Sequence, residues 1–241
     1  MNTSKIPWKL NDQMEIFLRL LNNNKPFAFA HFNDGELNMI IDPKKTPPSR
    51  EQKSSTSLSH KLKTSLIYKQ KNYFPGLPCS ICYPHLKQHA ILLRTDPNIQ
   101  NVLWWHALAF HHTKISYFTK LISSLKTKTI HWVINDQHNL QPLHTLGLDV
   151  KSCIKVQHLN AFDSYEDIFH KFSTFKSGDV VILLCGCLGR VLAQEWFAIR
   201  KDVSFLCLGS YFDSHIRNKK HLYDDIQQHK QCNECYDKSS F

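Results

Sequence analysis

Apolar residues along the chain fall alternately into helical repeats and into short continuous runs. Met14, Phe17 and Leu21 recur at the spacing of one helix face. Such patterns predict helices near residues 12–23, from Glu36 onward, and near 56–70, 113–125, 137–146, 164–175 and 189–200. Strand-like runs lie between them, in PFAFAHF, NVLWWHA, TIHWVIN, SCIKVQHL, DVVILLC and VSFLCLG. This alternation indicates βαβ units, so the sequence predicts a Rossmann-like α/β fold whose largely parallel sheet carries helices on both faces.

Two segments interrupt this alternation of helices and strands. Residues 42–55 are rich in proline, serine and lysine, and we expect a mobile loop there. The stretch YFPGLPCSICYP contains three prolines and a glycine, which predicts an irregular segment. There is no internal repeat and no clear linker. We therefore expect a single domain over residues 1–241, with a mobile basic loop at 44–56 and a C-terminal tail at 217–241.

Composition narrows the class of protein. The chain of 241 residues is 42% hydrophobic and 21% charged, which is typical of a globular protein. Its longest apolar stretches fall well short of the roughly 18 residues that a membrane helix requires. The first residues show no apolar block followed by a cleavage site, so they do not read as a secretory signal. We expect no transmembrane segment and a cytoplasmic location.

The net charge of +10 arises partly from one stretch of the chain. Residues 44–71 carry eight basic side chains against Glu51 alone. Nucleic acid, an anionic membrane surface and phosphate-bearing small molecules would all be attracted to it. Aromatic residues do not interleave the cluster before Tyr68, so the stacking platform of a single-strand binder is missing. Nucleic acid is thus the less favoured partner, and a solvated basic helix and loop is the simpler interpretation.

The cysteines form two spaced pairs. Cys79 with Cys82 and Cys232 with Cys235 are both C-x-x-C motifs, and two such pairs complete a tetrahedral four-thiolate zinc site. Such a zinc ion would be structural, because four thiolates leave no open position for catalysis. Incidental pairs or a redox couple are the alternatives. We expect the other cysteines to fill the core of strand-like runs: Cys153, Cys185, Cys187 and Cys207.

The first strand-like run is followed by a turn that carries two carboxylates. In HFNDGEL, Asp34 and Glu36 stand on either side of Gly35. Glycine lets the backbone turn sharply, so both carboxylates can face one point. Oxygen ligands of this kind suit Mg²⁺ or Mn²⁺ carrying a substrate diphosphate. Asn-Asp-Gly is also a common turn and Glu36 favours a helix N-terminus, so an ordinary turn is the simpler interpretation of this segment alone.

A second strand-to-helix turn follows DVVILLC. In parallel sheets ligands bind beyond the carboxyl ends of the strands, which draws attention to such turns. Gly186 and Gly189 lead into a helix, and Arg190 follows directly. Backbone N–H groups, the positive end of the helix dipole and a guanidinium all suit a phosphate. The three-glycine dinucleotide fingerprint is incomplete, and tight chain reversal explains the glycines nearly as well.

The last strand-like run ends in a polar turn. Gly209 and Ser210 are followed by Asp213 and His215. A carboxylate beside an imidazole makes a plausible couple for proton transfer, and Ser210 can bind a hydroxyl. Taken alone, the segment also reads as an ordinary polar loop.

Taken jointly, the three turns resemble one enzyme family. HFNDGEL is similar to the RFGDGEL segment of the GT-D type glycosyltransferases, whose metal-dependent site carries an Asp-x-Glu motif. GDVVILLCGCLGRVLAQEW and FLCLGSYFDSHI resemble the later glycine turn and the terminal loop of that family. The resemblance covers the first 40 residues and about residues 178–216. His31 stands where the family usually has Arg and Asn33 where it usually has Gly, two departures that bear on donor identity.

The resemblance implies a soluble transferase that moves a sugar from a nucleotide-diphosphate donor, with a UDP-sugar favoured, to a hydroxyl of a glycan, protein or lipid. Asp34 and Glu36 would hold Mn²⁺ or Mg²⁺, and Asp213 or His215 would accept the proton of the acceptor. The basic loop would close over the phosphates as a lid. The resemblance places these further residues at the donor site: His31, Asn33, Gly35, Gly186, Gly189, Arg190, Gly209 and Ser210.

Two other functions fit parts of the sequence. The fold class also supports another Rossmann-like enzyme that binds a nucleotide or transfers a methyl group, which would not need Asp34 together with Glu36. The charge and the cysteine pairs fit a zinc-stapled, basic nucleic-acid binding protein, whose affinity would fall steeply as salt rises.

Overall fold

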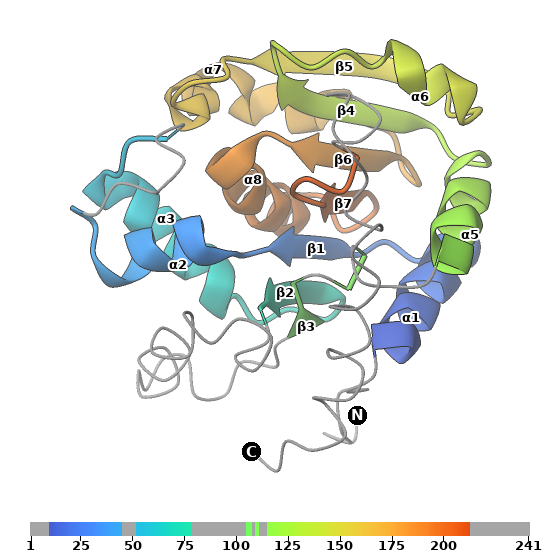
Figure 1. The fold of residues 1–241 in the computed structure, drawn as a ribbon, viewed down its shortest axis with the longest axis horizontal. Coiled ribbons are helices and arrows are strands. Elements are labelled where there is room, and N and C mark those ends of the chain that lie inside the picture. The colour runs from blue at the N-terminus through green and yellow to red at the C-terminus, as the bar shows by residue number, and fades with distance from the viewer. Residues whose placement is uncertain (1–9, 45–51, 79–104, 108, 111–114, 213–241) are drawn as a thin grey trace.

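A computed structural model describes residues 10–44, 52–78, 105–107, 109–110 and 115–212 of the chain. Within these ranges the strands form one sheet in the order β3-β2-β1-β7-β6-β4-β5, and every pair of neighbours is parallel (Figure 1). The strands are β1 (Ala28–His31), β2 (Tyr73–Leu77), β3 (Trp105–His106), β4 (Ile130–Asn135), β5 (Val150–Val156), β6 (Val180–Leu184) and β7 (Ser204–Cys207). The predicted parallel α/β fold is confirmed.

Helices connect the strands, as the sequence pattern predicts. The α-helices are α1 (Leu10–Asn22), α2 (Asp34–Ile41), α3 (Thr56–Ile67), α5 (Ile115–Leu125), α6 (Gln141–Thr145), α7 (Tyr165–Phe169) and α8 (Gly186–Ile199). Two 3-10 helices, η2 (Ala161–Ser164) and η3 (His170–Thr174), flank α7. The single helix expected near 164–175 is thus broken into short pieces. Among the described helices, none combines the length and the apolarity that crossing a membrane demands.

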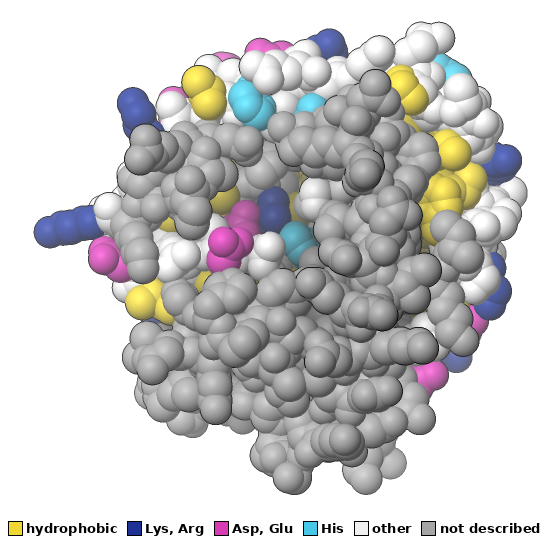
Figure 2. Space-filling view, in the orientation of Figure 1, with side chains coloured by type: hydrophobic (Ala, Val, Ile, Leu, Met, Phe, Trp, Pro, Cys, Tyr) yellow, Lys and Arg dark blue, Asp and Glu magenta, His cyan; other side chains and the backbone are white. Residues whose placement is uncertain are grey.

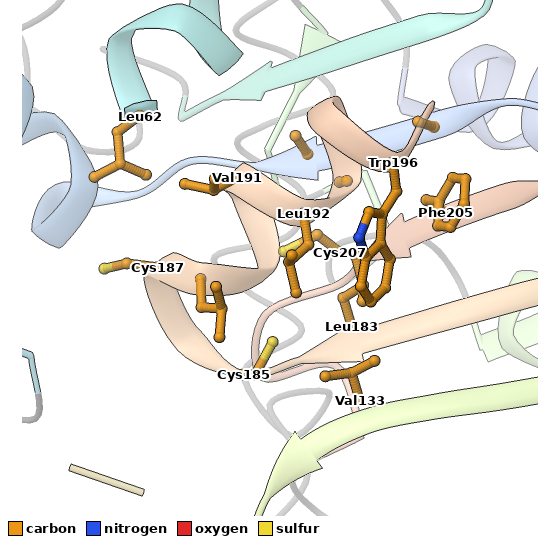
Figure 3. Close-up of a cluster of buried hydrophobic side chains, with 14 of the residues drawn as sticks. Leu62, Val133, Leu183, Cys185, Cys187, Val191, Leu192, Trp196, Phe205 and Cys207 are labelled. Carbon is orange, nitrogen blue, oxygen red and sulfur yellow. The ribbon is translucent and has the colours of Figure 1, made fainter. Parts of the chain in front are cut away.

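Both faces of the sheet are covered by hydrophobic cores. Successive residues of a strand point to opposite faces, so Val133 packs in one core and Trp132 in the other. The first core includes α2, α3 and α8, and the second includes α1 and α5. Figure 3 shows Trp196 of α8 lying against Phe205 of β7 in the first core. These two cores pack against both faces of the sheet, and this packing fixes the positions of the turns at its carboxyl edge.

The expectation of an irregular segment after Tyr73 is wrong for its first residues, which form β2. Proline is tolerated where its missing N–H breaks no ladder bond. Alternate residues of a strand direct their backbone groups to opposite neighbours. The carbonyl oxygen of Gly76 accepts a hydrogen bond from the N–H of Phe32, which directly follows β1. The backbone groups of Gly76 therefore point toward β1, and the nitrogen of the adjacent Pro75 points away from β1. On that side, within the described part of the chain, β3 pairs with Gly76 and Leu77 and not with Pro75.

The cysteines in strand-like runs divide into two groups. Cys185, Cys187 and Cys207 are buried, as expected. Cys153 is exposed, which contradicts the prediction of a core position. The reason is that β5 is the last strand in the sheet order, so it packs against β4 on one side only. An apolar run in the sequence does not reveal that its strand stands at an edge.

Candidate functional site

A pocket of about 370 Å³ opens at the carboxyl edge of the sheet. Because all the strands are parallel, the turns that follow them meet at this one edge. Figure 2 shows acidic, basic and histidine side chains gathered in a hollow on this side of the molecule. The lining residues come from the turns after β1, β4, β5, β6 and β7 and from the segment before α3: His31, Asn33, Asp34, Gly35, Glu36, Gln52, Asn135, His138, His158, Ala161, Leu184, Gly186, Cys187, Arg190, Gly209 and Ser210.

The structure brings together most of the residues that the sequence singled out. The turn after β1, the start of α8 and the turn after β7 all contribute to one pocket, although they are far apart in the chain. Asp213 and His215 lie outside the described residues, as do the zinc candidates Cys79, Cys82, Cys232 and Cys235. Among the described residues, no group of three His, Cys, Asp or Glu side chains is arranged to hold a metal ion.

Asp34 and Glu36 occupy different environments. Asp34 is the first residue of α2 and is half-buried at the pocket. Within the described part of the chain, its carboxylate has no ion-pair or hydrogen-bond partner. Glu36 is buried, and its Oε2 accepts from the backbone N–H of Asn33 at 2.9 Å, as in a capping box. Asp34 is therefore the carboxylate that faces the pocket with its oxygens available.

Arg190 binds the other oxygen of Glu36. The distance from Arg190 Nη2 to Glu36 Oε1 is 3.2 Å, and both side chains are buried. The guanidinium also donates to the backbone carbonyls of His31 and Gly186, and Nη2 lies 3.1 Å from His31 Nδ1. Burial works to lower the pKa of Arg190, but the Glu36 carboxylate and the neighbouring cysteine thiols together outweigh it, and the pKa is raised. Arg190 thus stays charged and ties α8 to the turn after β1.

Cys187 completes this buried cluster. Its Sγ donates to Glu36 Oε1 at 3.5 Å. Burial raises the pKa of the thiol well above its ordinary value, and the neighbouring Glu36 carboxylate adds to the effect. A thiol held neutral is a poor nucleophile, so the position of Cys187 favours a packing and hydrogen-bonding role over a reactive one.

The glycines of the two later turns have distinct roles. Gly186 and Gly209 both have φ of +58° and line the pocket, so each turn depends on a conformation that glycine adopts easily. A Cβ on Gly209 would lie 2.7 Å from His31 Nδ1. Gly189, by contrast, is absent from the pocket lining; a Cβ there would lie 3.0 Å from Cys207 Sγ. Gly189 therefore lets α8 pack closely on the sheet, and its expected role at the donor site stays a prediction.

The sequence patterns did not predict the pocket residues that follow β4 and β5. Asn135 ends β4, and His138 and His158 follow β4 and β5. These side chains could have been found by looking for polar residues directly after each predicted strand, since TIHWVIN ends in Asn135. The sequence did not reveal which of the many histidines face this edge, because that depends on strand order.

The end of the basic loop is anchored beside this pocket. Gln52 is buried and lines the pocket, and its Oε1 accepts from the Phe162 N–H at 3.1 Å. The Lys53 N–H donates to Asn160 Oδ1 at 2.7 Å. These bonds join the loop before α3 to the turn after β5. Residues 45–51, the centre of the expected lid, lie outside the described part.

Comparison with known proteins supports the fold assignment. No protein-family model matches the sequence, and no curated protein matches it. Among solved structures, a domain of unknown function 1792 described as having a distinct glycosyltransferase fold is similar, with a TM-score of 0.65 and 14% identity over 90% of this chain and 92% of the other. A new glycosyltransferase of the same domain type from Streptococcus sanguinis has a TM-score of 0.63 and 16% identity over 85% of this chain and 82% of the other. At such identities the likeness is one of fold.

Proposed function

We propose that this protein is a glycosyltransferase that moves a sugar from a nucleotide-diphosphate donor, with UDP-sugars favoured, to a hydroxyl acceptor. The observation that carries the proposal is the position of Asp34 in a pocket at which α2 and α8 both begin. The N-terminus of a helix presents backbone N–H groups and the positive end of its dipole, which favour a diphosphate. The fold shared with glycosyltransferases supports the same activity.

The donor set in the pocket fits a divalent cation bound together with the substrate. Mg²⁺ in such sites is typically held by one or two carboxylates, with the remaining positions taken by water and substrate phosphates. Asp34 would supply the direct carboxylate ligand, because its oxygens have no partner among the described residues. Glu36 keeps lone pairs beyond its bonds to Asn33, Arg190 and Cys187, so it is a weaker second ligand. A bound Mg²⁺ or Mn²⁺ would supply Lewis-acid stabilisation of the departing diphosphate.

The protein groups around Asp34 have separate tasks in this proposal. The backbone of Gly186 and the first turn of α8 would bind a phosphate through N–H groups. Arg190 lies behind this turn with its donors committed to Glu36, His31 and Gly186, so it contributes fixed positive charge and rigidity. Ser210 can hydrogen-bond a donor or acceptor hydroxyl at the turn after β7. Asp213 and His215 remain our candidates for the proton acceptor.

The proposal is tested by thermal unfolding of the whole protein with UDP, with Mn²⁺, and with both. UDP should raise the Tm only when Mn²⁺ or Mg²⁺ is present. Asp34→Asn should abolish this shift while the free energy of unfolding stays close to wild type, because the Asp34 carboxylate makes no contact that the fold needs. Asp42→Asn, at the other end of α2, is the matched control and should keep the shift; Asp42 is exposed and remote from the pocket lining.

Two results would contradict the assignment. One is a metal-dependent shift that survives Asp34→Asn. The other is the lack of any metal-dependent shift with UDP, GDP, CDP or ADP in the wild-type protein. A parallel screen of nucleotide sugars for metal-dependent hydrolysis identifies the sugar and the nucleotide if binding is found.

A further inference from the structure

Asn135 presents a buried acceptor to the end of the pocket that lies away from Asp34. It is the last residue of β4, lines the pocket and is 8% exposed. Its Oδ1 has no hydrogen-bond donor within reach in the described part of the chain. Leaving a buried acceptor without a hydrogen bond is unfavourable, so such groups in native proteins are normally paired with protein, water or ligand. The side chain therefore points to a ligand that donates a hydrogen bond at this place.

The residues beside Asn135 combine planar imidazole rings with apolar side chains. His138 follows β4, His158 and Ala161 follow the neighbouring β5, Leu184 ends the neighbouring β6, and all four line the pocket. The acidic residues of the lining, Asp34 and Glu36, both belong to the turn after β1. In the sheet order β1-β7-β6-β4, Asn135 stands three strands away from that turn. At about 4.8 Å per strand the two ends lie roughly 14 Å apart.

The opposite end of the pocket has the character of an anion site. It holds the start of α2 and the buried guanidinium of Arg190, which pairs with Glu36, and the start of α8, which follows β6, lies between the two ends. A nucleoside diphosphate has the same polarity, with charge at one end and a planar, hydrogen-bonding base at the other. A separation of roughly 14 Å, three strand spacings, is of the order of the span from a diphosphate to the far edge of its base.

We infer that Asn135 reads the hydrogen-bonding edge of the donor's base, with His138, His158, Leu184 and Ala161 enclosing its faces, and that the diphosphate lies toward Asp34. This inference rests on the proposed function and adds the orientation of the donor to it. Proteins that read a base use hydrogen bonds to its edge and apolar or aromatic contacts to its faces, and this end of the pocket offers both. An amide, which carries both a donor and an acceptor, suits an edge that carries both as well.

The donor's sugar is the competing occupant of this end. A sugar presents hydroxyls in several directions, whereas Asn135 offers a single amide between flat and apolar groups. A base therefore matches the lining better. With the base at β4 and β5, the sugar extends from the diphosphate on the β1 side, close to Ser210 and the turn after β7.

The test compares UDP with inorganic pyrophosphate by isothermal titration calorimetry in the presence of Mn²⁺. Asn135→Leu keeps the branching and the number of heavy atoms of the side chain and removes both hydrogen-bonding groups. It should weaken UDP binding about tenfold or more, and it should change pyrophosphate binding less than about twofold, because pyrophosphate has no base to be read. Asn139→Leu is the matched control, since Asn139 is exposed in the same loop and absent from the pocket lining; it should leave both affinities unchanged.

The outcomes separate this inference from the proposed function. If wild-type protein binds neither UDP nor another nucleoside diphosphate with Mn²⁺, the proposed function fails and the inference with it. If wild type binds and Asn135→Leu binds equally well, only the inference is overturned. Equal losses for UDP and pyrophosphate, or a loss confined to UDP-sugars while UDP binding is kept, also overturn it, because either would place another part of the donor at Asn135.

Discussion

Glu36 of α2 and Arg190 of α8 form a buried ion pair, with Oε1 and Nη2 3.2 Å apart. The pair joins two turns that are distant in the sequence and close together at the sheet edge. Glu36 also caps α2 through the Asn33 N–H, and Arg190 also binds the carbonyls of His31 and Gly186. Of the two carboxylates in the Asp-x-Glu turn, Glu36 is therefore bonded to both turns, whereas Asp34 has no partner among the described residues.

Breaking this pair should destabilise the fold strongly. Arg190→Met leaves the Glu36 carboxylate buried without its partner, which typically costs about 3–5 kcal/mol of unfolding free energy. The double variant Arg190→Met with Glu36→Gln removes the buried charge, so part of that loss should be recovered. Urea unfolding of both variants measures the difference.

The control for that comparison is Lys120→Met. Lys120 Nζ lies 2.8 Å from Glu15 Oε1, but both side chains are exposed and water screens the pair. The unfolding free energy should stay close to wild type. A similar loss for Arg190→Met and Lys120→Met would show that burial of the Glu36–Arg190 pair has no energetic consequence.

Gly186 and Gly209 should tolerate alanine to different degrees. Both have φ of +58°, so both variants carry the same backbone penalty, on the order of 1 kcal/mol. A Cβ at Gly186 meets nothing within 4 Å, whereas a Cβ at Gly209 would come within 2.7 Å of His31 Nδ1. Gly209→Ala should therefore be the more destabilised in urea and should also weaken metal-dependent UDP binding. Equal losses of stability would contradict the close approach of the His31 ring to Gly209.

The buried cysteines should resist alkylation in the folded protein. Cys185, Cys187 and Cys207 are buried, and burial raises the pKa of each thiol. Cys153 is exposed, and partial burial raises its pKa as well. Since the thiolate is the reactive form, labelling of Cys153 by iodoacetamide should become faster as pH rises from about 7 to about 9.

Peptide mapping by mass spectrometry assigns the labelled sites. In native protein Cys153 should be modified before the three buried cysteines, and all four should react in urea. Labelling of Cys187 at the rate of Cys153 without denaturant would mean that the cluster around Glu36 opens readily.

The two C-x-x-C pairs predict about one zinc ion per chain, measurable by elemental analysis of protein purified without added metal. Replacing Cys79 and Cys232 by serine should remove the zinc, because a four-thiolate site would lose half of its ligands. Cys153→Ser is the control and should keep it. Wild-type protein free of zinc would rule out the shared site.

The sequence by itself determined the alternation of strands and helices and the turns in which chemistry should be sought. Both follow from local features: the period of apolar residues fixes each element, and polar residues directly after a strand fall at the sheet edge. Met14, Phe17 and Leu21 mark α1, and HFNDGEL marks the turn into α2 for this reason. Local pattern could not reveal β2 or the exposure of Cys153, because both depend on which strand stands beside which.

Only the tertiary structure decided how the residues of the site divide their tasks. Asp34 and Glu36 look equivalent in the sequence and both line the pocket, yet Glu36 is paired with Arg190 while Asp34 has no partner among the described residues. Gly189 looks in the sequence like a phosphate-binding glycine, but in the structure it packs against Cys207. Asn135, whose buried Oδ1 has no partner in the described part of the chain, belongs to no sequence motif. The physical reason is that pairing, burial and pocket position arise from contacts between segments distant in the chain, and strand order sets those contacts.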